Sequence, residues 1–186
     1  MKDIIVYIVH GYTSSSDAEW FPWLKSKLSR IGVNVIVLDM PNSNAPIASE
    51  WIGHLSKNVK AIDENTYFIG HSLGCITLLR FLETQHDNTK MGGIILASGF
   101  VRKIPKYPNL DQFIKSDLDI KKMTKMTPNR CVFSAPNDNY VPYEYSCELA
   151  KFLEAKLITI ENGGHFIGQE GFIQFPQLFE EFRRMA

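Results

Sequence analysis

The sequence predicts an α/β protein with a doubly wound parallel sheet, that is, a sheet covered by helices on both faces. Six short apolar runs alternate with longer amphipathic segments, and repeated strand–helix alternation is typical of this fold class. The runs are nearly continuous and rich in Ile, Val, Phe and Tyr, as expected of strands buried on both faces. The predicted strands are Ile4–Val9, Val33–Leu38, Thr66–Ile69, Gly93–Ala97, Cys131–Ala135 and Leu157–Ile160.

Helical patterns fill the segments between these strands. In the first of them Trp23, Leu24 and Leu28 recur at helical spacing, and Gly32 is a typical stop after it. The third runs apolar along its length, so we expect it to cross under the middle of the sheet. The predicted helices are Glu19–Ile31, Ile47–Ile62, Leu73–Glu83, Tyr143–Leu153 and Phe172–Met185, the last of which kinks or starts at Pro176.

The segment Val101–Pro128 interrupts the alternation. It contains three prolines and the polar stretch Lys115–Lys125, and it is longer than a strand-to-helix connection needs. We expect a loop with one or two short helices above the strand ends, and the sequence leaves open whether this loop forms a partial lid. Because no linker, repeat or low-complexity tract divides the chain, residues 1–186 are predicted to form a single domain.

Charge and hydropathy exclude several classes of protein. Lysine and arginine together number 20, as do aspartate and glutamate, so the formal net charge is zero. A neutral chain lacks the long-range field that a general nucleic-acid binder or a membrane-surface protein uses. No run approaches the roughly 18 apolar residues of a membrane span. We therefore expect a soluble, cytoplasmic protein, a monomer or weak homodimer, without a nucleic-acid partner.

The three cysteines, Cys75, Cys131 and Cys147, are far apart and form neither Cys-x-x-Cys nor Cys/His spacing. A disulfide framework or a zinc site needs more than this. We expect reduced thiols that fill the core, and neither a metal nor a cofactor.

The strongest functional signal is the sequence GHSLG at residues 70–74, which directly follows a predicted strand and opens a predicted helix. This is the context of a nucleophile elbow, a tight turn that lifts a serine hydroxyl out of the sheet. Such a turn strains the backbone of Ser72, and Gly70 and Gly74 let neighbouring backbone approach where a Cβ would clash. Because GxSxG also occurs by chance in unrelated proteins, the motif needs catalytic partners.

Those partners follow later strands. A serine hydroxyl is barely nucleophilic at neutral pH and needs a base that an acid holds in place, in the chain order serine, acid, histidine. Asp138 follows the fifth predicted strand within PNDNYVP, and His165 follows the sixth within ENGGHF, where we expect the Gly-Gly pair to free the loop. A lone aspartate in such a turn is more often a cap, but the order and placement together predict a triad of Ser72, His165 and Asp138.

Other acids and histidines fit less well. Asp39 is expected in a turn or cap, and Glu161 is too close in sequence to the candidate base to orient it easily. His54 and His86 are predicted to lie on helix surfaces.

Backbone N–H groups are expected to stabilise the oxyanion of a tetrahedral intermediate. The N–H of Leu73, at the start of the helix after the serine, supplies one donor. The HGYT loop after the first strand supplies the second through the N–H of Tyr12, with Gly11 allowing the chain to turn. His10 is expected to hydrogen-bond this loop rather than to act in catalysis.

The substrate pocket is predicted to be lined by Gly11, Tyr12 and His71, with the His71 side chain directed away from the serine. Core packing of the first helix on the sheet is the default explanation for the nearby aromatic residues, and one or two of them lining an apolar acyl pocket is the alternative. These aromatic residues are Trp20, Phe21, Trp23 and Trp51.

The motifs HGYTSSS, EWFPWL, DMPNS, GHSLG, APNDNYVP and ENGGHF, in this order and spacing, resemble the small serine hydrolases of the retinoblastoma-binding-protein-9/YdeN-like family. The resemblance covers essentially the whole chain. It implies a minimal α/β-hydrolase fold, a three-layer αβα sandwich with a six-stranded parallel sheet and no large cap. Ser72, Asp138 and His165 match the family's triad positions. Physiological substrates are poorly defined across the family, and esterase or peptidase-like activity is implied for different members.

The chain departs from full-size α/β-hydrolases at its start. The HG loop normally follows the third strand and here follows the first, so two leading antiparallel strands are expected to be missing. This leaves the strand order 2-1-3-4-5-6 and little chain for a lid, and we expect a shallow, open site that accepts small acyl groups. The LxCxE motif associated with the mammalian relative does not occur, so its protein-binding role is not carried over.

The sequence thus predicts a serine hydrolase that forms an acyl-enzyme, with esters of small or medium acyl groups as substrates. An amidase or aminopeptidase with the same triad is an alternative, and its pocket would need an acidic group near the mouth to grip a free amine. A protein-interaction module on a hydrolase scaffold is the other alternative.

Overall fold

The computed structural model describes residues 3–186 and contains a six-stranded sheet in which all neighbouring strands are parallel. The α/β prediction is confirmed, and the strand order β2-β1-β3-β4-β5-β6 is the predicted one. The strands are β1 (Ile5–Val9), β2 (Asn34–Leu38), β3 (Thr66–His71), β4 (Gly93–Ala97), β5 (Arg130–Ser134) and β6 (Lys156–Thr159).

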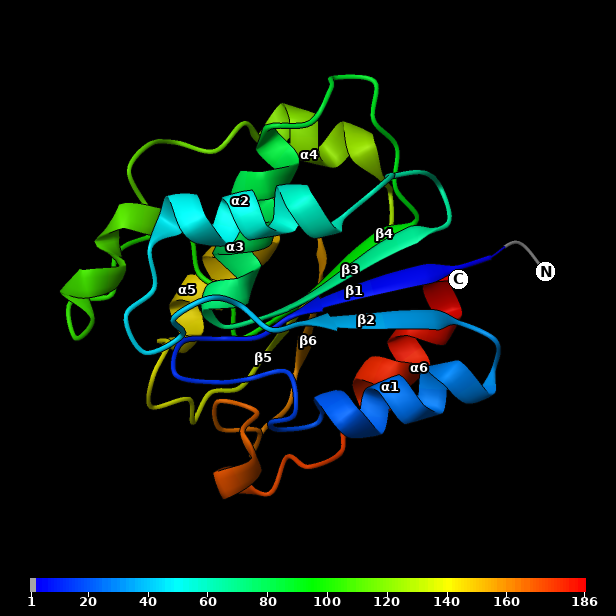
Figure 1. Cartoon of the computed structure of the whole chain (residues 1–186). Helices are drawn as coiled ribbons and strands as arrows, with labels where there is room; N and C mark the ends of the chain where they lie inside the picture. The colour runs from blue at the N-terminus through cyan, green and yellow to red at the C-terminus, as the bar shows by residue number, and fades with distance from the viewer. Residues whose placement is uncertain (1–2) are drawn as a thin grey trace.

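Helices cover both faces of the sheet and give three layers (Figure 1). One face carries α1 (Phe21–Arg30) and α6 (Pro176–Met185), and the other carries α2 (Ala48–Asn58), α3 (Leu73–Glu83), α4 (Ile120–Met126) and α5 (Tyr143–Phe152). Two short 3₁₀ helices are η1 (Pro108–Phe113) and η2 (Gly168–Glu170). Within residues 3–186 no large cap covers the sheet.

A hydrophobic cluster on each face holds the layers together. On the face of α1 and α6, Leu24 and Phe182 pack with Ile8 and Phe133 of the strands. On the other face α3 is buried along nearly its whole length because the sheet, α2 and α4 all pack against it. Its apolar sequence is therefore explained as predicted. Burial of apolar surface contributes about 25 cal/mol per Å², which makes these clusters the main source of stability.

Some element boundaries differ from the predicted ones. α2 ends at Asn58, well before Ile62, because Val59 adopts an extended conformation. α6 starts at Pro176, one of the two alternatives, so Phe172 lies in the preceding loop. The segment Val101–Pro128 contains η1 and α4, which confirms the prediction of one or two short helices.

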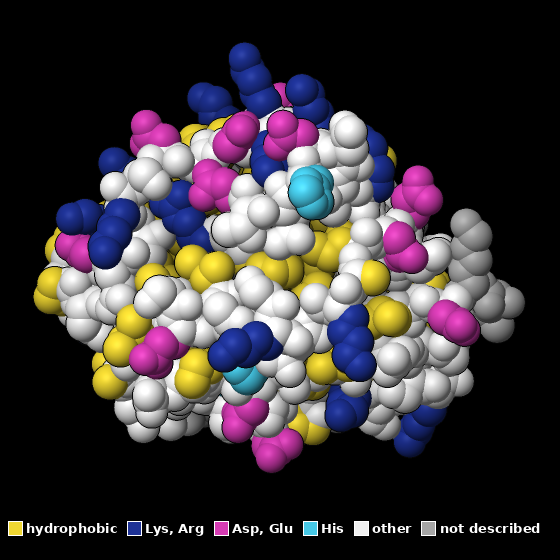
Figure 2. All heavy atoms as spheres, turned by 45° about the horizontal axis from the view of Figure 1, so that its top comes forward, with side chains coloured by type: hydrophobic (Ala, Val, Ile, Leu, Met, Phe, Trp, Pro, Cys, Tyr) yellow, Lys and Arg dark blue, Asp and Glu magenta, His cyan; other side chains and the backbone are white. Residues whose placement is uncertain are grey.

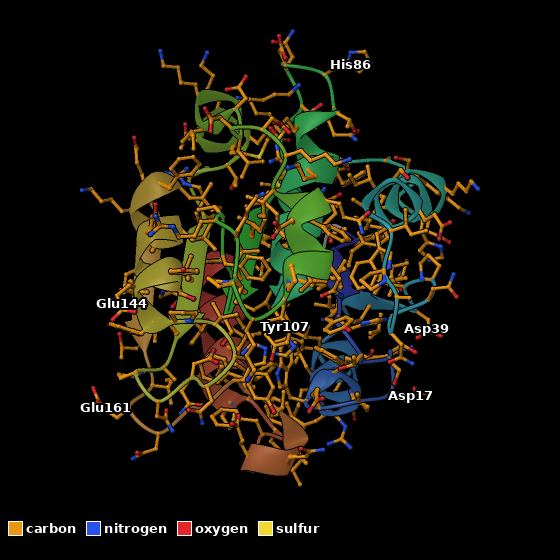
Figure 3. All side chains as sticks on the ribbon, turned by 90° about the vertical axis from the view of Figure 1, so that its left-hand side faces the viewer. Asp17, Asp39, His86, Tyr107, Glu144 and Glu161 are labelled. Carbon is orange, nitrogen blue, oxygen red and sulfur yellow. The ribbon has the colours of Figure 1, made fainter. Side chains whose placement is uncertain are left out.

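The site is positioned by the parallel arrangement. Because all six strands run in the same direction, their carboxyl ends share one edge of the sheet. Val9 pairs with Gly70 and His71 pairs with Ala97, so the loops after β1, β3 and β4 start side by side. The loops after β5 and β6 leave from the same edge, which faces the viewer in Figure 3.

The surface carries charges of both signs. On the face shown in Figure 2, lysine and arginine side chains lie among aspartate and glutamate side chains. No helix within the described residues has the length and apolar character needed to cross a bilayer. All three cysteines are free thiols; Cys75 and Cys131 are buried as predicted, whereas Cys147 is half-buried.

Candidate active site

Ser72 lies in the turn between β3 and α3, where the GHSLG pattern predicts it. Its φ and ψ of 52° and −118° are strained for a residue with a side chain. A Cβ on Gly74 would lie 2.2 Å from the Val9 carbonyl oxygen, and one on Gly70 would lie 2.9 Å from Cys75 Cα. Glycine at both positions therefore lets the turn pack against β1 and the start of α3.

Three side chains from three loops form one hydrogen-bonded chain at the sheet edge. Ser72 Oγ lies 3.0 Å from His165 Nε2. His165 Nδ1 lies 2.8 Å from Asp138 Oδ2 and 3.1 Å from Asp138 Oδ1. With Nδ1–H donating to the carboxylate, Nε2 is free to accept the serine proton. An arrangement of this kind can activate a hydroxyl as a nucleophile.

The Asp138 carboxylate has donors on both oxygens. Oδ1 accepts the N–H groups of Tyr140 at 2.8 Å and Val141 at 2.9 Å, and Oδ2 accepts the Ser98 hydroxyl at 2.8 Å. Burial by itself would raise the pKa of Asp138, but the His165 ring and the two backbone donors outweigh burial and hold this pKa below its usual value. The carboxylate is therefore ionised at neutral pH.

Ser98 is a candidate site residue that sequence reasoning missed. It directly follows β4, is buried, has a φ of 49°, and donates its hydroxyl to Asp138. Its backbone N–H donates to the Phe133 carbonyl at 3.0 Å and so continues the pairing of β4 with β5. The available signal was its place: it is a polar residue at the carboxyl end of a strand that lies between the strands leading to Ser72 and Asp138.

The backbone around His165 has side-chain partners of its own. Its N–H donates to Glu170 Oε2 at 2.6 Å, and the Gly164 N–H donates to Asn137 Oδ1 at 2.9 Å. A Cβ on Gly163 would lie 2.4 Å from an aromatic ring, and one on Gly164, whose φ is +54°, would lie 2.3 Å from the Glu170 carboxylate. The Gly-Gly pair thus serves close packing, and the φ of Gly164 lies in the region that favours glycine.

The two predicted oxyanion donors lie close to Ser72. A Cβ on Gly11 would be 3.0 Å from Ser72 Cβ, so the loop after β1 packs directly on the serine. Leu73 begins α3, where the helix dipole supplies positive potential. Within residues 3–186, neither the Tyr12 N–H nor the Leu73 N–H donates to a protein acceptor. Both donors are therefore available to a developing negative charge.

A cavity of about 400 Å³ opens beside Ser72 and His165. The predicted pocket residues Gly11, Tyr12 and His71 all line it. Part of the wall is apolar or aromatic and part is polar. Its other lining residues are Thr13, Ser14, Glu19, Phe100, Ile104, Tyr107, Leu110, Tyr140, Val141, Ile167 and Gln169.

The cavity wall differs from the sequence expectation in two ways. The four aromatic residues considered for the acyl pocket do not line it; Trp20, Phe21 and Trp51 are fully buried in the hydrophobic clusters, which is the default explanation. The loop between β4 and α4 supplies a wall through Ile104, Tyr107 and Leu110. This loop, for which the sequence left a partial lid open, thus forms part of the cavity wall, and Tyr107 lies near the centre of Figure 3.

His10 has the structural role predicted for it. Its Nδ1 lies 2.8 Å from the Gly11 carbonyl oxygen, and its Nε2 lies 2.9 Å from the Met40 backbone nitrogen. A carbonyl can only accept and a backbone N–H can only donate, so the ring is the neutral tautomer with the proton on Nδ1. Burial lowers the pKa of His10, which agrees with this neutral state.

The remaining candidates lie outside the hydrogen-bonded chain. Asp39 accepts the Ser16 N–H at 3.1 Å, and Glu161 is exposed at the periphery of Figure 3. His54 is half-buried on α2, as predicted. His86 is exposed in the loop after α3 rather than on a helix, because α3 ends at Glu83. Within the described residues, no cluster of His, Cys, Asp or Glu side chains is placed to hold a metal ion.

Comparison with known sequences places relatives along nearly the whole chain. The sequence profile of the serine hydrolase family matches residues 6–184. The hydrolase YdeN of Bacillus subtilis is 41% identical over 175 residues, which cover 94% of this chain and 92% of YdeN. Serine hydrolase RBBP9 of Rattus norvegicus is 26% identical over 153 residues, which cover 81% of this chain and 80% of that protein.

Solved structures share the fold. The crystal structure of the ydeN gene product from B. subtilis has a TM-score of 0.95 at 39% identity, with 98% of each chain covered. Est1E from Butyrivibrio proteoclasticus, in a structure with ferulic acid bound, has a TM-score of 0.74 at 18% identity, covering 98% of this chain and 89% of Est1E. At 18% identity the similarity shows the α/β-hydrolase fold alone.

Proposed function

The chain belongs to the serine hydrolase family, and from this premise we propose that it is a carboxylesterase acting on esters with small or medium acyl groups. The observation that carries the proposal is the hydrogen-bonded chain from Ser72 through His165 to Asp138 at the cavity wall. It supports the assignment of Ser72 as nucleophile, His165 as general base and acid, and Asp138 as the group that orients the imidazole.

Acylation begins with attack of Ser72 Oγ on the ester carbonyl carbon, while His165 Nε2 takes the hydroxyl proton. Asp138 holds the Nδ1–H tautomer and stabilises the imidazolium that forms. The bond from the carbonyl carbon to the alcohol oxygen then breaks, and the imidazolium gives its proton to that oxygen. The products of this half are an alcohol and an acyl-enzyme on Ser72.

The tetrahedral intermediate carries its negative charge on the former carbonyl oxygen. The N–H groups of Leu73 and Tyr12 are assigned as its donors, because both are unpaired in the described chain and lie beside Ser72. Loss of one such donor costs about 3 kcal/mol of barrier in other enzymes.

Deacylation repeats the same proton transfers with water as the nucleophile. His165 takes a proton from water, the hydroxide oxygen bonds to the acyl carbon, and the bond to Ser72 Oγ breaks. Ser72 Oγ then takes the proton back from His165. The released acid and the regenerated hydroxyl balance the reaction.

The cavity supports the substrate class. At about 400 Å³ it lies toward the small end of the ligand pockets found in proteins, roughly 300–1,000 Å³. Phe100, Ile104, Leu110 and Val141 give it an apolar wall for an acyl chain. A long lipid chain would exceed this space, so small or medium acyl groups fit best.

A second candidate, an amidase or aminopeptidase with the same three residues, is favoured by one specific observation. Glu19 places a carboxylate on the cavity wall, where it also accepts the Gly168 N–H. The Glu19 carboxylate is the acidic group that an aminopeptidase needs near the cavity to bind the ammonium group of its substrate.

The proposal is tested by labelling with a fluorophosphonate probe and mapping the adduct. We expect modification at Ser72 in the wild type and none in Ser72→Ala. The p-nitrophenyl esters of acetate, butyrate, octanoate and palmitate then give kcat/KM as a function of acyl length, and we expect palmitate to be the poorest. A folded wild type that is neither labelled nor hydrolyses any of these esters would contradict the proposal and favour the protein-interaction alternative.

The amine question needs a matched pair of substrates. The p-nitroanilide of an amino acid carries a free ammonium group, whereas its N-acetyl derivative carries an uncharged and bulkier amide in its place. A preference for the free amine that disappears in Glu19→Gln would favour the aminopeptidase.

The cytoplasmic location, the monomer or weak homodimer and the single domain stay predictions.

A further inference from the structure

His71 is a buried histidine that the reaction as written does not use. It is the last residue of β3 and directly precedes Ser72. Its side chain is almost completely buried, and its ring lies 5.0 Å from the His165 ring between their centroids. His71 Nε2 lies 2.8 Å from the backbone carbonyl oxygen of His165. Because a carbonyl oxygen only accepts, Nε2 carries the proton and donates it.

We propose that His71 is a positioning residue that holds the backbone of His165 so that its imidazole stays within hydrogen-bond distance of Ser72. The proposal rests on the proposed function, in which His165 is the general base.

Four backbone groups around His165 are hydrogen-bonded to side chains. The His165 N–H donates to Glu170, and its carbonyl accepts from His71. The Gly164 N–H donates to Asn137, and the Trp20 indole N–H donates to the carbonyl of the residue after His165 at 3.1 Å. Of these partners His71 is the one that adjoins the nucleophile in the chain.

His71 itself stands on rigid structure. It pairs with Ala97 in the sheet, and the N–H of Ser72 donates to the Ala97 carbonyl at 2.9 Å. The donor at Nε2 is thus fixed to the same backbone that carries the Ser72 hydroxyl. A shift of the His165 loop away from Ser72 would break the His71 bond, so this bond sets the distance between nucleophile and base.

The surroundings of His71 favour a neutral donor. The rings of Trp20 and Phe21 contact it edge-on at 6.1 and 6.0 Å, and its Nδ1 is buried without a hydrogen-bond partner in the described part of the chain. A proton on Nδ1 would therefore be unpaired. Burial, together with the neighbouring His165 ring, lowers the pKa of His71 to about 3. A second cation next to His165 would oppose the imidazolium that catalysis needs, and a neutral His71 avoids it.

The test compares two substitutions at this position. His71→Leu removes the donor at similar size, whereas the amide of His71→Gln can still donate to the carbonyl. Exposed His86, far from the site at the top of Figure 3, provides the control His86→Leu. We measure kcat and KM with p-nitrophenyl butyrate and the second-order rate constant of Ser72 labelling by a fluorophosphonate.

For His71→Leu we expect kcat and the labelling rate constant to fall on the order of tenfold to a hundredfold, the effect of misplacing a catalytic group by about 1 Å, with KM nearly unchanged. His71→Gln should recover most of the loss, and His86→Leu should match the wild type. Wild-type rates in His71→Leu would overturn the proposal. Equal losses in His71→Leu and His71→Gln would also overturn it.

A spectroscopic measurement keeps the proposal testable whatever the activity. In the wild type at pH 7, the imidazole ¹⁵N chemical shifts should show that the ring proton of His71 is on Nε2. The proton between His165 and Asp138 should give one sharp downfield ¹H signal. That signal should shift or broaden in His71→Leu and stay unchanged in His86→Leu. A proton on Nδ1 of His71 overturns the proposal even where His71→Leu does not fold. A wild type without esterase activity would contradict the carboxylesterase proposal alone, because the ¹H signal still tests the positioning role of His71.

Discussion

Ser98 donates its hydroxyl to Asp138 Oδ2 at 2.8 Å, the same carboxylate oxygen that lies 2.8 Å from His165 Nδ1. The Asp138 carboxylate that contacts the imidazole is therefore itself held from the end of β4. A hydrogen bond to a charged acceptor contributes about 1.5–3 kcal/mol, and leaving the acceptor unpaired in a buried place costs a similar amount.

Ser98→Ala should lower both stability and activity. We expect the free energy of unfolding to fall by about 1.5–3 kcal/mol, measured by urea denaturation. If about 1.4 kcal/mol of the interaction is used to stabilise the transition state, kcat/KM falls about tenfold. The pKa of Asp138 should rise, because the carboxylate loses a donor.

Ser146→Ala is the matched control for this substitution. Ser146 is also a buried serine, and its hydroxyl donates at 2.8 Å to the carbonyl of Gly99, the residue after Ser98, rather than to Asp138. It should lose stability by about 1 kcal/mol and keep wild-type kcat/KM. If Ser146→Ala and Ser98→Ala impair activity equally, Ser98 acts through general stability rather than through Asp138.

Gly74→Ala should be among the most damaging substitutions in the chain. The added Cβ would lie 2.2 Å from the Val9 carbonyl oxygen and 2.7 Å from the His10 carbonyl oxygen, both of them backbone atoms that cannot move aside as a side chain can. The loop with the Tyr12 donor must therefore shift away from Ser72. We expect loss of ester hydrolysis and a loss of several kcal/mol in the free energy of unfolding.

Gly53→Ala gives the opposite expectation for the same chemical change. Gly53 lies inside α2, and a Cβ there would have no neighbour within 4 Å. Alanine in a helix is more stable than glycine by about 0.5–1 kcal/mol, so the melting temperature should rise with activity unchanged. A destabilised Gly53→Ala would show that the difference between the two sites is not steric.

Ser72→Gly and Ser72→Ala should differ in stability although both lack the hydroxyl. The Ser72 φ of 52° is costly for alanine and acceptable for glycine. Strain of this kind costs about 1–3 kcal/mol, and glycine gives back about 0.4–1 kcal/mol through the entropy of the unfolded chain. We expect Ser72→Gly to be the more stable by about 1 kcal/mol in urea denaturation. Equal stabilities would mean that the turn is not strained at this residue.

Sequence reasoning found the candidate site residues whose position relative to a strand carries the signal. Ser72, Asp138 and His165 each follow a buried strand, and parallel strands bring such positions to one edge. Ser98 also follows a strand, but no motif marks it. Glu19 lines the cavity and accepts the N–H of Gly168, a contact across most of the chain that no local pattern records.

The residues of the cavity wall were also hard to predict, because they meet only in the folded chain. The segment Val101–Pro128 reads as a polar, proline-containing connection with few large apolar clusters, although Ile104, Tyr107 and Leu110 recur at every third position. In the folded chain Ile104, Tyr107 and Leu110 come together on one side of the cavity. Of the aromatic residues that the sequence analysis considered for the pocket, Trp20 and Trp51 are instead completely buried in the core.

The burial of His71 gives a pH dependence of stability whose sign can be worked out. Its pKa is about 3 in the folded protein, lowered from 6.5 first by burial and then by the nearby His165. Above pH 6.5 the His71 ring is neutral in both the folded and the unfolded state, so its contribution to the free energy of unfolding is fully present. As pH falls from 6.5 toward 3 the unfolded chain binds a proton that the folded protein does not, so the free energy of unfolding falls by about 1.4 kcal/mol per pH unit, or roughly 4 kcal/mol in all.

His71→Gln should flatten this dependence, because glutamine does not titrate. Urea midpoints of wild type and variant at pH 7, 6, 5 and 4 measure it, and the gap between the two proteins should narrow as pH falls. Asp138 also loses its stabilising ionisation in acid, but it does so in both proteins and cancels in the comparison. A gap that stays constant from pH 7 to pH 4 would mean that His71 takes up a proton in the folded state, and its Nδ1 would then need an acceptor among the neighbours that now leave it unpaired.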